Sequence, residues 1–208
     1  MRHVSPAVAR YLALGDSYTI GEGVAAADRW PVRLVAALRT RGAVVDDPHI
    51  IARTGWTCDE LWAGIDVAHP HGGYALVSLL IGVNDQYRGW SAAEYAPRFT
   101  RLLERAIGFA AAAAAGRVLV LSVPDWGVTP FAAGRDRAAI AADIDGFNAV
   151  NHAATLAAGA RYVDITTESR RAGADASSLA ADGLHPGVAM HEAWADLALP
   201  VAAAIVGA

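Results

Sequence analysis

Short apolar runs alternate along the chain with longer segments rich in alanine. The runs are apolar at consecutive positions rather than at every second one, which is typical of parallel strands covered by helices on both faces. Strands are therefore predicted at five places: Tyr11 to Leu14, Val44 to Ile51 with an interruption, Ala75 to Ile81, Val118 to Val123 and Arg161 to Ile165.

The segments between these runs carry helix signals. Thr57 and Ser91 are each followed three positions later by a glutamate. This is the capping box, in which a hydroxyl and a carboxylate bind free backbone N–H groups of the first turn. Apolar residues at helical spacing also predict a helix from Trp30 to Arg41, ended by Gly42. Further helices are predicted over about Arg135 to Ala158 and Val188 to Val206.

Strands and helices alternate without a repeat or a linker, so the chain is predicted to be one domain over residues 1–208. The alternation predicts an α/β fold of three layers, α/β/α, with a doubly wound, five-stranded parallel sheet. Ligands bind such sheets beyond the carboxyl ends of the strands. Candidate chemistry is therefore sought in the loops that follow the strands.

Composition excludes several kinds of chemistry. All 17 basic residues are arginine, so a lysine nucleophile and a P-loop lysine are both excluded. Cys58 is the only cysteine, which excludes an internal disulfide and a cysteine-rich zinc site. No metal site is predicted from His69 and His71, or from His191 with Glu192, because no further ligand follows at helical spacing. These histidines are expected to lie on the solvated surface.

Charge and hydropathy indicate the kind of partner. The formal net charge is −4 and the arginines form no basic run, which argues against nucleic acid and favours a small molecule. The segment Met1 to Arg10 has no apolar stretch of signal-peptide length. The apolar stretches Ala106 to Ala115 and Leu197 to Ala208 are shorter than the roughly 18 to 20 residues of a membrane span. We therefore expect a cytoplasmic protein without stable membrane insertion; the oligomeric state is left open.

Two loops contain the residue types of a nucleophilic site. Ser17 follows the first predicted strand in the sequence Gly15-Asp16-Ser17, where a side chain is exposed at the edge of the sheet. Asp182 and His185 lie three residues apart, so the carboxylate can accept the Nδ1 proton and leave Nε2 free as a base toward Ser17. Singly, Ser17 could equally cap a helix and Asp182 form a turn. Their combination favours a Ser-His-Asp triad.

A serine hydrolase also needs hydrogen-bond donors for the oxyanion that develops in its transition state. The backbone N–H groups of Ser17 and Gly55 and the side-chain amide of Asn84 are candidates, since all three residues follow predicted strands. Taken separately, Asn84 could be a turn residue and Gly55 the start of a helix.

Together these residues resemble the four sequence blocks of the SGNH hydrolases, also called the GDSL esterase/lipase family. The matching segments, in family order, are Gly15-Asp16-Ser17, Gly55, Gly82-x-Asn84-Asp85 and Asp182-x-x-His185-Pro186. They span positions 15 to 186, which is most of the chain. The sequence departs from the pattern at Tyr18, where the family name has leucine, and beside Gly55, where Arg53 and Trp56 replace smaller polar residues.

The resemblance implies a flavodoxin-like sheet in the strand order 2-1-3-4-5 and hydrolysis of an ester through an acyl-serine, with no metal or organic cofactor. It makes Ser17 the nucleophile, His185 the general acid/base, Asp182 its orienting partner, and Ser17, Gly55 and Asn84 the oxyanion hole. A small-molecule carboxylic ester is favoured as the substrate. An acyl thioester or an acetylated sugar, hydrolysed at the same site, is the alternative.

Large side chains in the same loops are candidates for the walls of a substrate pocket: Trp56, Tyr87, Trp126 and Phe131. Trp126 and Phe131 belong to a long loop, Pro124 to Arg135, after the fourth predicted strand. The alternative is that these aromatic residues pack the loop onto the domain, because aromatic side chains are commonly half-buried.

Two unrelated functions remain as alternatives. Gly21-x-Gly23-x-x-Ala26, with Asp46 twenty residues further on, is a permitted form of the fingerprint of NAD(P)-binding oxidoreductases. However, its first glycine should follow the strand at once, and here Gly15 to Ile20 intervene. A non-catalytic binding module would keep the same sheet and loops, but no position of the triad or the oxyanion hole is missing.

Overall fold

Five parallel strands form the central layer of the computed structural model, which describes residues 8–208. The strands are β1 (Tyr11–Gly15), β2 (His49–Ala52), β3 (Leu76–Leu80), β4 (Val118–Leu121) and β5 (Arg161–Val163). They pair in the order β2-β1-β3-β4-β5, which confirms the predicted order. Most of the segment Met1 to Arg10, which we expected not to be a signal peptide, lies outside the described residues.

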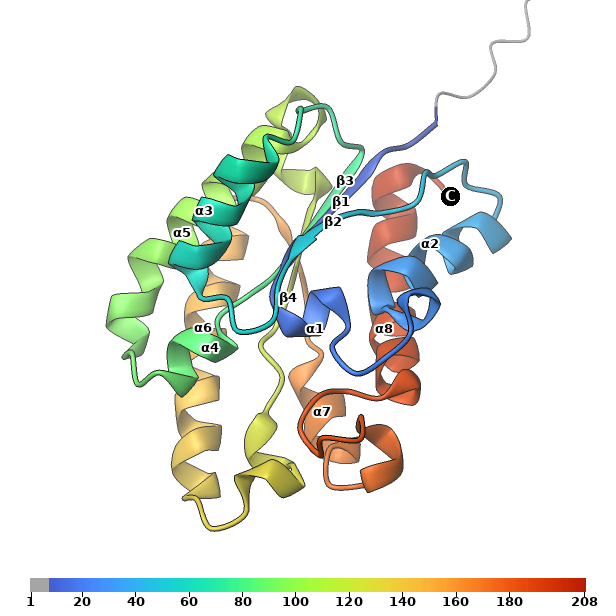
Figure 1. Ribbon diagram of the computed structural model, residues 1–208. Helices are drawn as coiled ribbons and strands as arrows, with labels where there is room; N and C mark the ends of the chain where they lie inside the picture. The colour runs from blue at the N-terminus through green and yellow to red at the C-terminus, as the bar shows by residue number, and fades with distance from the viewer. Residues whose placement is uncertain (1–7) are drawn as a thin grey trace, which may run out of the picture.

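Helices cover both faces of this sheet. The longer helices are α2 (Trp30–Thr40), α3 (Cys58–Ala68), α5 (Ala92–Phe109), α6 (Arg137–Ala157) and α8 (Val188–Val206), and the shorter ones are α1 (Ser17–Ile20), α4 (Val83–Tyr87) and α7 (Thr166–Ala172). Single 3-10 turns lie at Ala26–Asp28, Ala111–Ala113, Ala115–Arg117, Trp126–Val128, Pro130–Ala132 and Ala176–Ser178. Helices α3, α5 and α6 lie on one side of the sheet, and α2 and α8 on the other (Figure 1). The predicted three-layer α/β/α fold is confirmed.

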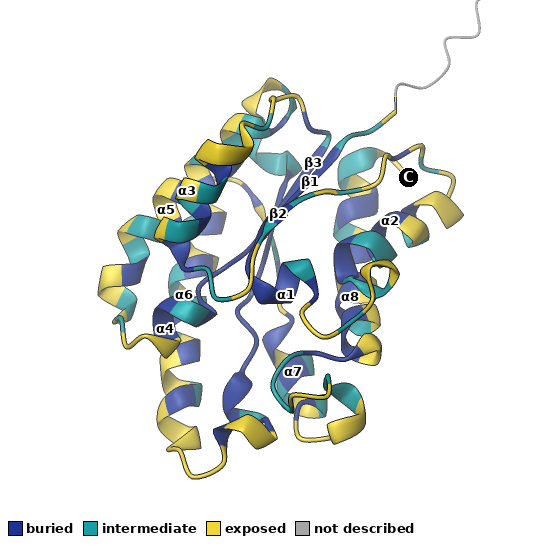
Figure 2. Ribbon diagram, viewed as in Figure 1, coloured by how far each residue is buried: buried dark blue, intermediate teal, exposed yellow. Residues whose placement is uncertain are grey.

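The strands are apolar at consecutive positions because successive side chains enter two different cores. In β1, Leu12 and Leu14 pack with residues of α3 and α5, whereas Tyr11 and Ala13 pack with residues of α2 and α8. All five residues of β1 and of β3 are buried, and these central strands are dark in Figure 2, whereas the edge strand β2 is partly exposed. The absence of a period of two in the sequence is therefore the signature of a sheet with no solvated face.

The two capping boxes begin helices as predicted. The Thr57 hydroxyl accepts from the backbone N–H of Glu60, whose carboxylate accepts from the N–H of Thr57, and α3 starts at the next residue. Ser91 and Glu94 form the same reciprocal pair at the start of α5. Both predictions are confirmed. The two capping boxes set the residues at which α3 begins after β2 and α5 begins after α4.

The second strand is shorter than predicted. The expected range, Val44 to Ile51, reduces to β2 at His49–Ala52, with Val45 making one isolated bridge to Ala9. Between them lie two aspartates and Pro48, which has no N–H to donate to a ladder. An edge strand tolerates this loss, because only one of its sides pairs with a neighbour.

The last helix, α8 (Val188–Val206), has the predicted bounds. Of the helices within residues 8–208, it alone is long and apolar enough, by length and composition, to cross a bilayer. Its residues Met190, Trp194 and Ala198 are buried in the core shared with α2. His191, expected on the surface, is fully buried there, and its Nδ1 accepts from the backbone N–H of Trp30 at 3.3 Å. Burial lowers the pKa of His191 to about 4.

Candidate active site

Ser17 lies where β1 turns into α1. Gly15 ends the strand, and a Cβ at this position would lie 2.2 Å from Thr19 Oγ1 and 2.5 Å from the carbonyl oxygen of Leu80, so the turn requires glycine. Asp16 caps α1 by accepting from the N–H of Tyr18 at 3.0 Å. Ser17 is therefore the first residue of α1 rather than its cap, and its hydroxyl is left free of the capping role.

Asp182 and His185 form one hydrogen-bonded unit before α8. Asp182 Oδ2 lies 2.6 Å from His185 Nδ1, while Oδ1 accepts from the backbone N–H groups of Leu184 and His185 at 2.9 Å each. Partial desolvation acts to raise the pKa of Asp182, but the hydrogen bonds from the His185 ring and the two N–H groups outweigh it and lower that pKa. Asp182 is therefore a carboxylate at neutral pH that orients the imidazole.

Two loops at the same edge of the sheet position Gly55 and Asn84. Gly55 has a φ of +84°, a conformation that favours glycine, and its carbonyl oxygen accepts from Arg88 Nη2 at 2.7 Å. Asn84 lies in the first turn of α4, and its Nδ2 donates to the carbonyl oxygen of Trp56 at 2.9 Å. A primary amide has two N–H groups, so this bond orients Asn84 and leaves one donor for another acceptor.

Four of these residues meet in one cavity of about 220 Å³. It is lined by Ser17, Tyr18, Thr54, Gly55, Val83, Asn84, Tyr87, Trp126, Phe131, Leu184 and His185. Residues from the loops after β1, β2, β3 and β4 and from the loop before α8 are thus brought together. The cavity lies at the carboxyl ends of the strands, as a doubly wound sheet predicts.

Three of the predicted aromatic residues line this cavity as one cluster, the aromatic wall: Tyr87, Trp126 and Phe131. The Tyr87 ring centroid lies 5.4 Å from that of Trp126 and 6.3 Å from that of Phe131. Trp126 is buried, and its Nε1 donates to Gln86 Oε1 at 2.8 Å, whereas Tyr87 and Phe131 are partly exposed. The wall therefore both lines the cavity and packs the long loop onto the domain.

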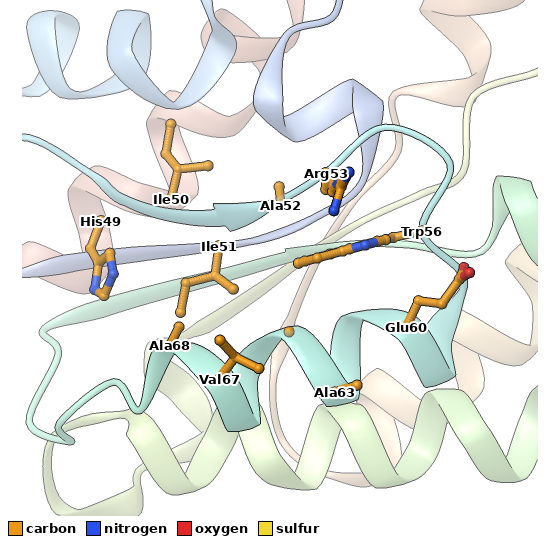
Figure 3. Close-up of a pocket in the computed structure, with 11 residues that line it drawn as sticks. His49, Ile50, Ile51, Ala52, Arg53, Trp56, Glu60, Ala63, Val67 and Ala68 are labelled. Atoms are coloured by element: carbon orange, nitrogen blue, oxygen red, sulfur yellow. The ribbon is translucent and has the colours of Figure 1, made fainter.

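Trp56, expected in the same pocket, lies elsewhere. Its indole extends along a separate groove of about 560 Å³ between β2 and α3 (Figure 3). It packs so closely on Gly64 of α3 that a Cβ there would lie 2.2 Å from the ring. Neither Ser17 nor His185 lines this groove. The prediction for Trp56 is therefore corrected: its carbonyl oxygen supports Asn84, while its side chain fills the space that Gly64 leaves.

Some lining residues were missed in the sequence. Tyr18, Thr54, Val83 and Leu184 each adjoin a predicted site residue, so their position next to Ser17, Gly55, Asn84 or His185 was an available signal. Arg135 was also missed: its guanidinium carbon lies 5.2 Å from the ring centroid of Tyr87, 5.3 Å from Trp126 and 5.7 Å from Phe131. No local pattern indicates this stacking, because Tyr87 is distant from Arg135 in the chain.

Two buried carboxyl groups lie behind the cavity. Burial raises the pKa of Asp16 to about 8, and the nearby charge of Asp85 adds to this effect, while the hydrogen bond from Tyr18 opposes it. Burial likewise raises the pKa of Asp85 to about 6, against the hydrogen bond from the N–H of Cys58. Asp16 Oδ2 is buried without a hydrogen-bond partner. The Asp16 carboxyl is therefore held mainly neutral near pH 7.

The alternative chemistries find little structural support. Gly21 ends α1 in the left-handed conformation instead of opening a helix directly after β1, so the pyrophosphate cradle of a dinucleotide fold is not formed there. Among residues 8–208, the His, Cys, Asp and Glu side chains form no group of three or more that could hold a metal ion.

Known proteins resemble this chain in sequence profile and in fold. Residues 13–193 match the model of the GDSL-like lipase/acylhydrolase family. A member of the lipolytic protein G-D-S-L family from Veillonella parvula has a TM-score of 0.75 at 16% identity, over 93% of this chain and 98% of that one. TesA has a TM-score of 0.72 at 20% identity, over 94% and 99%. Axe2, an acetylxylan esterase from Geobacillus stearothermophilus, has a TM-score of 0.67 at 16% identity, over 96% and 94%.

These structural likenesses show a shared fold. The search of curated proteins found no match to the chain. The match to the family model therefore shows the family, and the similar solved structures show the fold alone.

Proposed function

This chain belongs to the GDSL-like lipase/acylhydrolase family and is a serine hydrolase acting on ester bonds, and from that premise we propose that it hydrolyses small carboxylic esters with Ser17, His185 and Asp182 as its triad. The observation that carries the proposal is the meeting of Ser17 and His185 in one cavity, with Asp182 held 2.6 Å from His185 Nδ1. A nucleophile, a base and a group that orients the base are the parts that acyl transfer requires.

The proposed reaction has two halves. As Ser17 Oγ attacks the acyl carbon, His185 Nε2 takes the hydroxyl proton and then passes it to the departing alcohol, leaving an acyl-serine. Water, deprotonated by the same nitrogen, attacks the acyl carbon, and Ser17 regains its proton. Asp182 stays ionised throughout and stabilises the imidazolium formed at each step.

The oxyanion of each tetrahedral intermediate needs donors that are already oriented. We assign this role to the N–H groups of Ser17 and Gly55 and to the second N–H of the Asn84 amide. Two hydrogen bonds support this assignment. The carbonyl oxygen of Gly55 accepts from Arg88, and the side-chain amide of Asn84 donates to the carbonyl oxygen of Trp56. Because these groups are fixed before substrate binds, little reorganisation is needed when the charge develops.

The cavity favours a small substrate. Its volume of about 220 Å³ is below the roughly 300–1,000 Å³ of pockets that enclose drug-sized ligands. The aromatic wall offers apolar contact for a short acyl chain. An acetylated sugar is the second candidate, since one structural neighbour is an acetylxylan esterase, and an acyl thioester remains the third.

A substrate panel tests the proposal. Rates are measured on p-nitrophenyl esters of increasing acyl length, an acetylated sugar and an acyl-CoA, with wild type, Ser17→Ala and the exposed control Ser177→Ala. We expect hydrolysis and labelling by a fluorophosphonate to be lost only in Ser17→Ala, and the shortest esters to be the best substrates. Unchanged turnover in Ser17→Ala would refute the nucleophile, and a best rate on long chains would refute the small pocket.

A further inference from the structure

An arginine stacks on the rings of the aromatic wall. The guanidinium of Arg135 lies within 6 Å of the ring centroids of Tyr87, Trp126 and Phe131, the range of a cation–π contact. Its Nη2 also donates to Tyr87 Oη at 3.2 Å. All three rings line the cavity that contains Ser17 and His185, whereas Arg135 itself is not a lining residue; its positive charge is therefore one ring away from the space open to the proposed substrate.

The charge of Arg135 is not neutralised by a neighbouring carboxylate. Some other arginines are paired, such as Arg88 with Glu60 at 3.0 Å and Arg170 with Asp125 at 2.9 Å. Within residues 8–208, no carboxylate oxygen lies within 4.0 Å of the Arg135 guanidinium. A guanidinium has five N–H donors, and within residues 8–208 the one side-chain hydrogen bond that Arg135 donates goes to Tyr87.

The surroundings of the cavity suit an anion on this side. None of the residues that line it is an aspartate or glutamate. Asp136, next to Arg135, is occupied as the cap of α6 and accepts from the N–H of Ala139 at 3.0 Å. Of the carboxylates that contact lining residues, Glu22 accepts from the hydroxyl of Thr54 and Asp182 is bonded to His185. The charged group that contacts the rings of the aromatic wall is the Arg135 guanidinium.

We propose that Arg135 is a specificity-determining residue, and that the ester hydrolysed at this site carries an anionic group, a carboxylate or a phosphate, beyond a short apolar segment. The apolar segment lies against the aromatic wall, and the anion receives N–H donors from the guanidinium above it. This inference rests on the proposed function, since it names the substrate class of the same cavity. The anion can belong to the acyl part or to the alcohol part of the ester.

Matched substrate pairs separate charge from size. For the acyl side, the mono-p-nitrophenyl ester of glutaric acid is compared with the corresponding primary amide. For the alcohol side, 4-acetoxybenzoate is compared with 4-acetoxybenzamide. Each pair differs only in a carboxylate against a neutral carboxamide of similar shape. We expect wild type to prefer one anionic member by about 10-fold in kcat/KM, a modest factor because the pair with Arg135 is solvent-exposed.

Arg135→Met removes the charge and keeps a long side chain over the rings. We expect it to abolish the preference, so that the anionic and neutral members of a pair are hydrolysed at similar rates, and we expect salt to weaken the preference in wild type. Arg135→Lys should retain part of the preference for the anionic substrate. The control is Arg41→Met, an exposed arginine just after α2, far from the cavity in the chain and in the fold.

Each outcome has one meaning. Loss of preference in the acyl pair places the anion on the acyl side, and loss in the alcohol pair places it on the alcohol side. Equal loss on charged and neutral substrates, or no preference in wild type, overturns the inference and leaves Arg135 as a packing residue of the wall. Because the neutral esters report Ser17-dependent hydrolysis by themselves, failure of the proposed function would be seen separately, as turnover that survives in Ser17→Ala.

Discussion

Replacement of Asp16 by asparagine should change how the stability of this protein depends on pH. Burial raises the pKa of the Asp16 carboxyl from 3.8 to about 8 in the folded state. Asparagine has the same shape and keeps the oxygen that accepts from the N–H of Tyr18, but it cannot ionise. The substitution therefore removes the proton equilibrium and leaves the hydrogen bond in place.

The direction in which the free energy of unfolding changes with pH follows from proton binding to Asp16. Between about pH 4 and pH 8 the folded protein keeps the Asp16 proton and the unfolded chain has lost it, so the free energy of unfolding falls as pH rises. Each pH unit in that interval lowers it by about 1.4 kcal/mol. Asp85, whose raised pKa is about 6, and His191, whose lowered pKa is about 4, change their contributions mainly below pH 6.5. The interval from pH 6.5 to 8 therefore isolates Asp16.

Within that interval wild type should lose on the order of 1 to 2 kcal/mol relative to Asp16→Asn, because the effect levels off as pH approaches 8. The corresponding difference in Tm is about 3 to 6 °C for a chain of this size. Urea unfolding followed by circular dichroism at half-unit steps measures it, and the exposed control Asp46→Asn should run parallel to wild type. If wild type and Asp16→Asn also run parallel from pH 6.5 to 8, Asp16 is not held neutral and the reasoning fails.

Three further substitutions test the site. Asn84→Ala should lower kcat on a short p-nitrophenyl ester by about 10²- to 10³-fold with little change in KM, and an effect on KM alone would contradict an oxyanion role. Asp182→Asn should lower kcat by about 10²- to 10⁴-fold at neutral pH, because the imidazole loses its orienting carboxylate. Against partial desolvation, the hydrogen bonds from His185 and Leu184 lower the pKa of Asp182, so the carboxylate is charged at neutral pH, and a variant as active as wild type would exclude it from the triad. Gly64→Ala should destabilise the fold by about 1 to 3 kcal/mol in urea unfolding, because its Cβ would lie 2.2 Å from the Trp56 ring, and unchanged stability would show that Trp56 does not pack there.

Local patterns in the sequence were sufficient for the elements and for part of the site. Short runs rich in consecutive apolar residues predicted five strands, the second of them with bounds that were too wide, and reciprocal hydroxyl and glutamate pairs predicted the starts of α3 and α5. The pair of Asp182 and His185 could be predicted because their hydrogen bond spans three residues. Each of these features depends on atoms that are close in the chain, so a short window of sequence contains all the information needed.

The orientation of large side chains was decided by the tertiary structure. Trp56 adjoins Gly55 in sequence, yet its ring lies in another groove because Gly64 leaves room for it. His191 looked like a surface residue, yet α2 and α8 enclose it together with Trp30.

The sequence by itself therefore determined which residue types are available for chemistry and at which end of the sheet they lie. Only the packing of distant segments decided which of them share a cavity, and it placed Arg135 over an aromatic wall whose rings come from α4 and from the segment between β4 and α6. The physical reason is that a side chain's direction is set by the space and the partners left by residues far away in the chain. Hydrophobic periodicity and capping signals depend only on residues that are close in the chain, so they do not indicate which distant residues will become neighbours.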